Sequence, residues 1–423
     1  MALLDHEAAS RRYEAAQRRI KSQADSWNSR HMNKSLVAIV KGSTDPDASQ
    51  IDALVREAVA LTGGLGSFVT RGDTVIIKPN LIAPASPEQG ATTDYRICKC
   101  LADQVRELGG RPVIAEGSGT GIDTEDSIKA SRYDLLRSGG YEVVDLKKSR
   151  TVLLPVPKGT VLSEIMVPEI VLKADAIINV PKMKTHGQVL ATLCVKNMKG
   201  ILPDSLKKKF HTTYGVFRCV AELATVVKPS LNVVDGIIAQ EGLGPLLGTP
   251  VPMGLVIAGR DPVAVDTITA LIMGIDPYAL ETSKRAAELG VGTINPDEIK
   301  VVGSRIEDVS RRFKLSSEAM YEFLHMPYGF DLVFNEKACT GCRNGVLATL
   351  RDLEIAGRMD ILRGLRIVCG KTESNLPPTD KKTLLVGACT AQHKSDFGFL
   401  GGCPPNCVDV LAAIMAWADG DAK

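Results

Sequence analysis

Short apolar runs alternate with longer amphipathic segments from about residue 35 onward. The runs are rich in β-branched residues, as is typical of strands that are buried on both faces of a parallel sheet. The amphipathic segments between them end at glycines, which predicts helices. This alternation predicts an α/β fold with a doubly wound, mostly parallel sheet. We expect the strands at residues 35–42, 73–82, 111–117, 174–180, 230–238, 252–259 and 298–303, and helices at 51–65, 93–110, 261–274 and 281–290.

Breaks in this pattern divide the chain into four parts. The helical spacing of apolar residues in 1–34 predicts an N-terminal helical extension. Its narrow apolar stripe could pack on the rest of the chain or on a second copy in a homodimer. A cloning-derived leader is an alternative for this part. Residues 35–305 form the predicted anion- or substrate-binding α/β domain, and 306–328 form a connector with one helix. Residues 329–423 predict a second, smaller α/β domain that carries a cluster of cysteines.

The cysteines of this second domain have the spacing of a cofactor site. Cys339 and Cys342 form a C-x-x-C pair, Cys389 follows an apolar run in LLVGAC, and Cys403 lies in GGCPP. Thiolates that converge from such turns bind a [4Fe-4S] cluster or a tetrahedral zinc ion. Ligand type alone leaves zinc open, whereas disulfides are disfavoured because nothing in the chain indicates secretion.

The same region resembles the proximal-cluster domain of the small subunit of nickel-iron hydrogenases and the related subunit of respiratory complex I. The similarity lies in the order of strand, CTGC, helix, strand, strand ending in VGAC, and GGCPP before a further helix. It implies that Cys339, Cys342, Cys389 and Cys403 hold one [4Fe-4S] cluster. Cys369 and Cys407 fall outside this pattern.

Composition narrows the class of protein. A net charge of +2 and an aromatic content of 4% argue against nucleic acid as a partner. No apolar run approaches the roughly 18 residues that a membrane span needs. Ten cysteines in a chain without a recognisable signal favour a reducing, cytoplasmic location.

Polar residues follow several of the predicted strands. Lys78 and Asn80 follow one strand, Glu116 and Ser118 a second, and Asp235 lies in a third. Ligands of open parallel sheets bind at the carboxyl ends of the strands, so we expect a site there. The glycine-rich turn GSGTG has neither the dinucleotide fingerprint nor the phosphate-loop lysine, and we interpret it as an ordinary tight turn.

The segment from residue 181 to 215 is the second strong chemical signal. Lys182 and Lys184 alternate, so both side chains can point the same way, and His186 follows them. Lysines at a sheet edge suit a phosphate or carboxylate. We interpret Lys207, Lys208 and Lys209 as a solvated basic loop. The predicted substrate-binding residues are Lys78, Asn80, Lys182, Lys184, Asn197 and Lys199, and the candidates for proton transfer are His186, Lys196 and Glu241.

The first domain resembles an uncharacterised "iron-sulfur centre protein" family, a group of unknown function. The strings that carry the resemblance are IIKPN, PKMKTH, VKNMKG, VVDGI and GRDPVAVD. It implies an architecture and candidate residues but no reaction. Many members attach ferredoxin-type cysteine clusters, and this chain departs from them in its hydrogenase-like second domain.

Two functions of different classes fit these patterns. The first is a cluster-dependent enzyme, an oxidoreductase that acts on a small anionic organic substrate and takes electrons from a donor such as ferredoxin or flavodoxin. If one iron lacks a cysteine ligand, a lyase is implied instead. The alternative is an electron-transfer or cluster- and metal-delivery accessory protein, which needs no buried cationic pocket.

An enzyme of this kind must bring its substrate and its cluster together. We therefore expect a cleft between the domains, with the loops that carry CTGC and GGCPP on one side. Lys182, Lys184 and His186 should line the other side, with Lys78, Asn80, Lys196 and Glu241 nearby.

Overall fold

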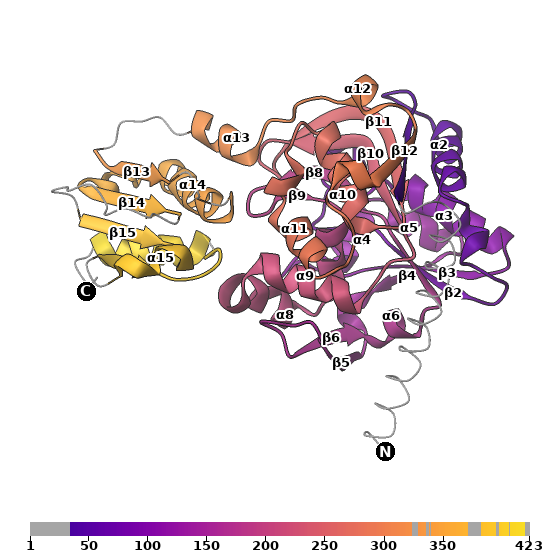
Figure 1. The fold of residues 1–423 in the computed structure, drawn as a ribbon, viewed down its shortest axis with the longest axis horizontal. Coiled ribbons are helices and arrows are strands. Elements are labelled where there is room, and N and C mark those ends of the chain that lie inside the picture. Colours follow the sequence, from indigo (N-terminus) through magenta and orange to yellow (C-terminus); the bar gives the residue numbers. More distant parts are fainter. Residues whose placement is uncertain are drawn as a thin grey trace, which may run out of the picture.

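The structure is a computed structural model with two α/β parts (Figure 1). It describes residues 34–323, 329–335, 338, 340–370, 382–394, 397–405 and 407–418. The predicted N-terminal extension and Cys339 lie outside the described residues. Within the part that is described, no helix is long and apolar enough to cross a membrane.

The larger part is built on one ten-stranded sheet. Strand β11 (Thr249–Gly259) runs antiparallel to both of its neighbours. Strand β8 (Lys182–His186) pairs in parallel with β10 (Leu231–Glu241) and antiparallel with β9 (Leu190–Thr192). The other pairs are parallel, so the prediction of a mostly parallel sheet is confirmed. The order is β12 (Ile299–Gly303), β1 (Ser35–Lys41), β11 (Thr249–Gly259), β10 (Leu231–Glu241), β7 (Ala176–Asn179), β2 (Thr74–Lys78), β3 (Arg111–Glu116) and β4 (Glu142–Asp145).

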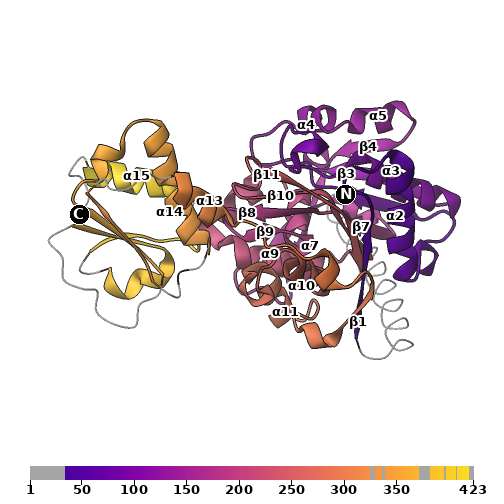
Figure 2. The ribbon, with the colours of Figure 1, turned by 90° about the horizontal axis from the view of Figure 1, so that it is seen from above.

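Helices cover both faces of this sheet (Figure 2). Successive strand residues point to opposite faces, and Ile76 accordingly packs in one core while Val75 and Ile77 pack in another. One face carries α2 (Ala48–Leu61), α3 (Tyr95–Glu107), α4 (Thr124–Ala130) and α5 (Tyr133–Ser138). The other carries α6 (Glu169–Lys173), α9 (Val216–Val226), α10 (Pro262–Ile272) and α11 (Glu281–Glu288), with a hairpin of β5 (Thr151–Pro155) and β6 (Glu164–Pro168).

Asp261, Cys194 and Cys219 have structural roles in the larger part. Asp261 accepts hydrogen bonds from the backbone N–H groups of Val263 and Ala264, so it caps α10. Cys194 and Cys219 are fully buried in the apolar cores.

The smaller part is a four-stranded parallel sheet with two long helices. Helices α14 (Thr340–Ile355) and α15 (Cys407–Ala418) pack against each other, and α13 (Ser316–Phe323) packs on α14. Helix α12 (Ile306–Val309) precedes α13. The predicted second α/β domain is therefore present. Its strand order is β13 (Asp331–Phe334), β14 (Leu365–Cys369), β15 (Lys382–Val386) and β16 (Gly398–Leu400).

The strand order marks where a ligand should bind. From β2 the chain proceeds to β3 and β4 on one side, whereas β7 is followed by β10 on the other side. Connections therefore diverge between β2 and β7, and the crevice outside their carboxyl ends is the usual ligand position in such sheets. Helices α7 (Cys194–Asn197) and α8 (Asp204–Lys209), the 3₁₀ turn Met198–Ile201 and the π-helical turn Phe210–Tyr214 lie in the chain between β9 and β10.

Candidate anion-binding site

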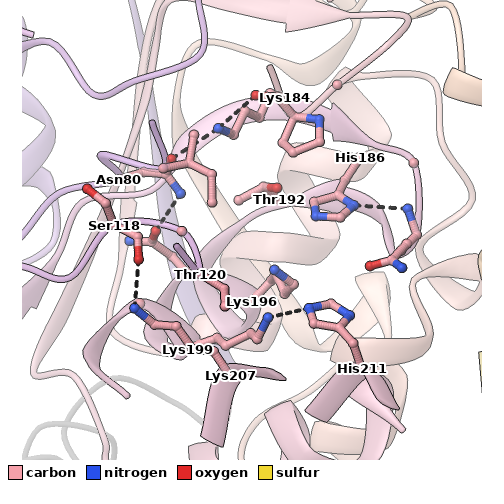
Figure 3. A pocket seen from close by; sticks show the side chains of 18 of the residues that line it. Asn80, Ser118, Thr120, Lys184, His186, Thr192, Lys196, Lys199, Lys207 and His211 are labelled. Atoms are coloured by element: carbon pink, nitrogen blue, oxygen red, sulfur yellow. Dashed lines mark hydrogen bonds between the residues drawn. The ribbon is translucent and has the colours of Figure 1, made fainter. Parts of the chain in front are cut away.

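A cavity of about 460 Å³ lies at this carboxyl edge and is walled by both parts of the protein (Figure 3). The larger part contributes Asn80 after β2, the turn after β3, and the segment from β8 to the π-helical turn. The smaller part contributes α14 and the first residue of α15. The lining residues that bear on its chemistry are Asn80, Glu116, Ser118, Lys184, His186, Thr192, Lys196, Asn197, Lys199, Lys207, His211, Asn344 and Cys407.

The cavity has an excess of positive charge. Lys184, Lys196, Lys199 and Lys207 all line it, and all are at least nine-tenths buried. Among the described residues that line the cavity, Glu116 is the one carboxylate, and it is already paired with the buried ammonium group of Lys78. Buried charges of one sign are costly unless an opposite charge joins them. The arrangement is therefore suited to an anion.

Strand β8 directs Lys184 into the cavity. Its Nζ donates hydrogen bonds to Asn80 Oδ1 at 3.0 Å, to the carbonyl of Ala91, and to the carbonyl of Pro245 at 3.2 Å. Burial, followed by repulsion from Lys196, holds the pKa of Lys184 well below its usual range. Lys184 is thus fixed in orientation by neutral acceptors.

Lys196 differs from the other cavity lysines in its contacts. It lies on the short helix α7 and is 9% exposed, yet its Nζ has no hydrogen-bond partner among the described residues. Burial, together with the charge of Lys78, lowers the pKa of Lys196 to about 8. An amine with this pKa is present in both protonation states near neutral pH.

The remaining two lysines are held by neighbours on the opposite wall. Lys199 contacts the Nε2 atom of His211, and burial lowers the pKa of that histidine to about 2. Lys207 donates to the carbonyls of Gly117 at 2.7 Å and Ser118 at 2.8 Å. Burial also lowers the pKa of Lys207 to about 8.

The interpretation of Lys207 as solvated was wrong, because the side chain is only 3% exposed. The first turns of α8 bury Leu206 and Lys207 against the body. Lys208 and Lys209 are exposed, as expected.

The GSGTG turn, which we interpreted as an ordinary tight turn, belongs to the site. Gly117, Ser118, Gly119 and Thr120 all line the cavity. Their position directly after a buried strand was the signal that could have revealed this.

His186 presents a neutral ring to the cavity. Its Nδ1 accepts a hydrogen bond from the backbone N–H of Gln188 at 3.0 Å, so the neutral ring carries its hydrogen on Nε2. Burial, with repulsion from Lys196, holds the pKa of His186 well below its usual range. The ring can therefore donate a hydrogen bond from Nε2 without carrying a charge.

A chain of buried asparagines fixes α7 to the ends of three strands. Asn80 Nδ2 donates to Asn197 Oδ1 at 2.8 Å, Asn197 donates to Asn179 at 2.8 Å, and Asn179 donates to Asn232 at 2.9 Å. Asn80 and Asn197 were predicted as substrate-binding residues, and both line the cavity. Asn179 and Asn232 were missed; Asn179 follows the apolar residues of β7, whereas Asn232 lies at the start of β10. The network positions the adjacent Lys196.

Lys182 and Lys78 do not line the cavity, which corrects their predicted role. Lys182 Nζ lies 2.7 Å from Asp235 Oδ2, and both side chains are buried. Lys78 pairs with Glu116 in the same way. These ion pairs join β8 to β10 and β2 to β3, so both lysines are structural.

The second pair also imposes a steric limit. A Cβ on Gly200 would lie 2.7 Å from Lys78 Nζ, so a larger residue at this position would displace the ammonium group from its place in the pair.

Glu241 also lies away from the cavity. At the end of β10 its carboxylate accepts hydrogen bonds from Arg311 at 2.8 Å and from the backbone N–H of Lys314 at 2.9 Å. It ties β10 to the segment before α13 and is not among the lining residues. No sequence pattern indicated Arg311, 70 positions further on, as the partner of Glu241.

The described cysteines of the smaller part gather at the carboxyl ends of its strands. A Cβ on Gly387 would lie 2.6 Å from Cys342 Sγ and 3.6 Å from Cys389 Sγ, so both thiols flank this glycine. The backbone N–H of Ala388 donates to Gly402 at 2.8 Å, which places the loop of Cys403 alongside. This set of donors suits a thiolate-bound group. Within the described residues, no three metal-binding side chains form a group.

The cysteine loops adjoin the wall of the cavity. A Cβ on Gly215 would lie 2.7 Å from the carbonyl of Cys403, and one on Gly341 would lie 3.2 Å from the carbonyl of Gln188. Cys407, which the sequence left without a role, lines the cavity directly. The structure thus brings Lys184, His186 and Lys196 to the face of the smaller part.

Fold and site together define a two-part α/β protein with a buried cationic cavity. Residues 75–271 match the family described as "Domain of unknown function (DUF362)". The expected likeness of the first domain to a group of unknown function is confirmed, whereas its link to iron-sulfur proteins and the hydrogenase-like character of the second domain stay interpretations.

Two known proteins are similar to this chain. A thylakoid-associated protein from Synechocystis sp. is 29% identical over 250 residues, which are 58% of this chain and 77% of that protein. The lactate racemase apoprotein from Thermoanaerobacterium thermosaccharolyticum aligns over 92% of this chain and 91% of its own, with 12% identity and a TM-score of 0.38. This structural likeness is too low to carry an argument about function.

Proposed function

We propose that this protein is an enzyme that acts on a small organic anion bound in the cavity, with a [4Fe-4S] cluster in the smaller part as its redox group. The carrying observation is the buried cavity itself, in which four lysines face one carboxylate that is already paired. An electron carrier or a cluster-delivery factor has no use for such a cavity. The enzyme is therefore favoured over the accessory protein.

The depressed pKa values describe the cavity without its anion. Removal from water is the largest cause for each of the four lysines, and repulsion between lysines adds to it. A bound carboxylate or phosphate would favour the protonated lysines and raise their pKa values. Binding of the anion and uptake of protons are thus coupled.

The residues of the cavity can have separate roles in the reaction. Lys184, Lys199 and Lys207 would bind and orient the anionic group. His186 Nε2–H would donate a hydrogen bond to a second oxygen of the substrate, and the amine of Lys196, which has no partner among the described residues, would act at the reacting carbon. Cys339, Cys342, Cys389 and Cys403 would hold the cluster, which supplies single electrons when bound, received from a donor such as ferredoxin or flavodoxin.

Anions should protect the protein against heat. With phosphate or a dicarboxylate at 100 times its dissociation constant, we expect about 2.7 kcal/mol of added stability. Lys184→Met should remove most of this protection, because it deletes a cavity cation. Lys173→Met is the matched control, since Lys173 is half exposed and paired with Glu169 on the surface. Equal protection of both variants, measured by thermal unfolding, would exclude the cavity as the anion site.

The cluster can be tested independently. Protein prepared without oxygen should contain about four irons and four sulfides per chain and should be brown. Cys342→Ala, Cys389→Ala or Cys403→Ala should abolish the colour, whereas Cys219→Ala should keep it, because Cys219 is a core residue. If the protein instead contains one equivalent of zinc and no iron, the site holds a structural metal and the proposed redox group is excluded.

A further inference from the structure

We propose that Lys196 is a covalent catalytic residue whose amine forms a Schiff base with the carbonyl carbon of an oxo acid bound in the cavity. The inference rests on the proposed function, because the acid group of the substrate must first be held by the neighbouring cations. It names the substrate class, a carboxylic acid that also carries a ketone or aldehyde.

Contacts single out Lys196 among the cavity lysines. The ammonium group of Lys184 has three oxygen acceptors, that of Lys207 has two carbonyls, and that of Lys199 contacts His211. In Figure 3, dashed lines reach Lys184, Lys199 and Lys207 but not Lys196. A nucleophilic amine needs a lone pair that no neighbour engages. Among the described residues that line the cavity, Lys196 is the lysine with this property.

The surroundings keep this amine partly neutral. The titratable groups that act on it or feel its charge come from several elements. They are the lysines Lys78 from β2, Lys184 from β8 and Lys199 beside α7, and the neutral imidazoles of His186 from β8 and His211 from the π-helical turn. The carboxylate of Glu116, which could have favoured the ammonium form, is taken up by Lys78. Desolvation beside other cations is a known way to activate a lysine.

Other atoms of the wall lack partners that a ligand could supply. Thr192 Oγ1 and Asn344 Oδ1 are buried, belong to lining residues, and have no hydrogen-bond partner among the described residues. They lie on the two parts of the protein, one on β9 and one on α14. A substrate with several oxygens and a hydroxyl or water can satisfy both.

The proposed step conserves atoms and electrons. The neutral amine of Lys196 attacks the carbonyl carbon and gives both of its hydrogens to the carbonyl oxygen. That oxygen leaves as water, and a C=N bond replaces the C=O bond, without oxidation or reduction. His186 Nε2–H donates a hydrogen bond to the departing oxygen, while the carboxylate stays on the lysines of the opposite wall.

Reductive trapping tests the step directly. The whole protein is incubated with pyruvate and borohydride, and its peptides are analysed by mass spectrometry. The hydride reduces the imine to a stable secondary amine, so the peptide that contains Lys196 should gain the mass of pyruvic acid minus one oxygen. Lactate, which lacks the carbonyl, should give no label. Lys196→Arg should lose the label while keeping the charge, whereas Lys173→Arg should be labelled like the wild type.

The pH dependence separates Lys196 from surface lysines. Trapping needs the neutral amine, so the rate at Lys196 should rise through a pKa of about 8, while surface lysines react appreciably only near pH 10. If pyruvate protects the protein against heat but no label appears on Lys196, the Schiff base is excluded and anion binding stands. If pyruvate gives neither protection nor label, the proposed function fails with it.

Discussion

Lys182→Met should destabilise the protein by roughly 3–5 kcal/mol, because it leaves the carboxylate of Asp235 buried without its partner. Both side chains are essentially inaccessible, and their charged atoms lie 2.7 Å apart. Asp235 also accepts a hydrogen bond from the backbone N–H of Asp94 at 2.8 Å, so it cannot simply reorient. Urea unfolding of the variant and the wild type measures the difference.

Two further variants test the cause of this loss. Lys173→Met removes a half-exposed member of an ion pair and should cost no more than about 0.5 kcal/mol. Adding Asp235→Asn to Lys182→Met should restore part of the stability, since no charge then stays buried alone. A loss below about 1 kcal/mol for Lys182→Met alone would mean that water reaches this pair.

Lys196→Met should have the opposite effect near neutral pH and stabilise the anion-free protein by about 3 kcal/mol. In the unfolded chain the lysine titrates at its ordinary pKa of 10.5, whereas burial lowers this pKa to about 8 in the folded protein. Between these values the unfolded state binds the proton and the folded state does not. Stability therefore falls as the pH drops from 10.5 to 8, and the cost is complete below pH 8.

Unfolding at a series of pH values between 7 and 11 measures this effect. The advantage of Lys196→Met should shrink above pH 8 and vanish near pH 10.5, and phosphate should reduce it by raising the pKa of Lys196. Lys173→Met should show no such dependence. A wild type that is as stable as Lys196→Met at pH 7 in anion-free buffer would show that the amine is not desolvated.

Most strands of the larger sheet were predictable because burial on both faces makes their sequences almost purely apolar, whereas the short strands β4 and β9 were not expected. The same rule failed at β8, where Lys182, Lys184 and His186 are all buried in one short strand. Its polar sequence resembles a loop, and the partners that make burial tolerable lie far away in the chain. The hairpin of β5 and β6 was missed because prolines interrupt its sequence.

The site was predictable to the extent that it depends on strand ends. Asn80, Lys184, His186 and Lys196 were expected together, and the crevice between β2 and β7 brings them together. The residues with which these side chains form ion pairs and hydrogen bonds were not predictable, because they depend on which strands are neighbours. Lys182 meets Asp235, which is 53 positions away, only because β8 pairs with β10.

The wall that α14 and α15 add to the cavity has a kinetic consequence. Both walls belong to one polypeptide, joined through α13, so they meet by an intramolecular encounter whose frequency does not depend on protein concentration. Dilution therefore leaves the site complete, unlike a site that forms between separate subunits. Severing the chain between α13 and β13 would turn a first-order event into a second-order one, and activity would then fall on dilution.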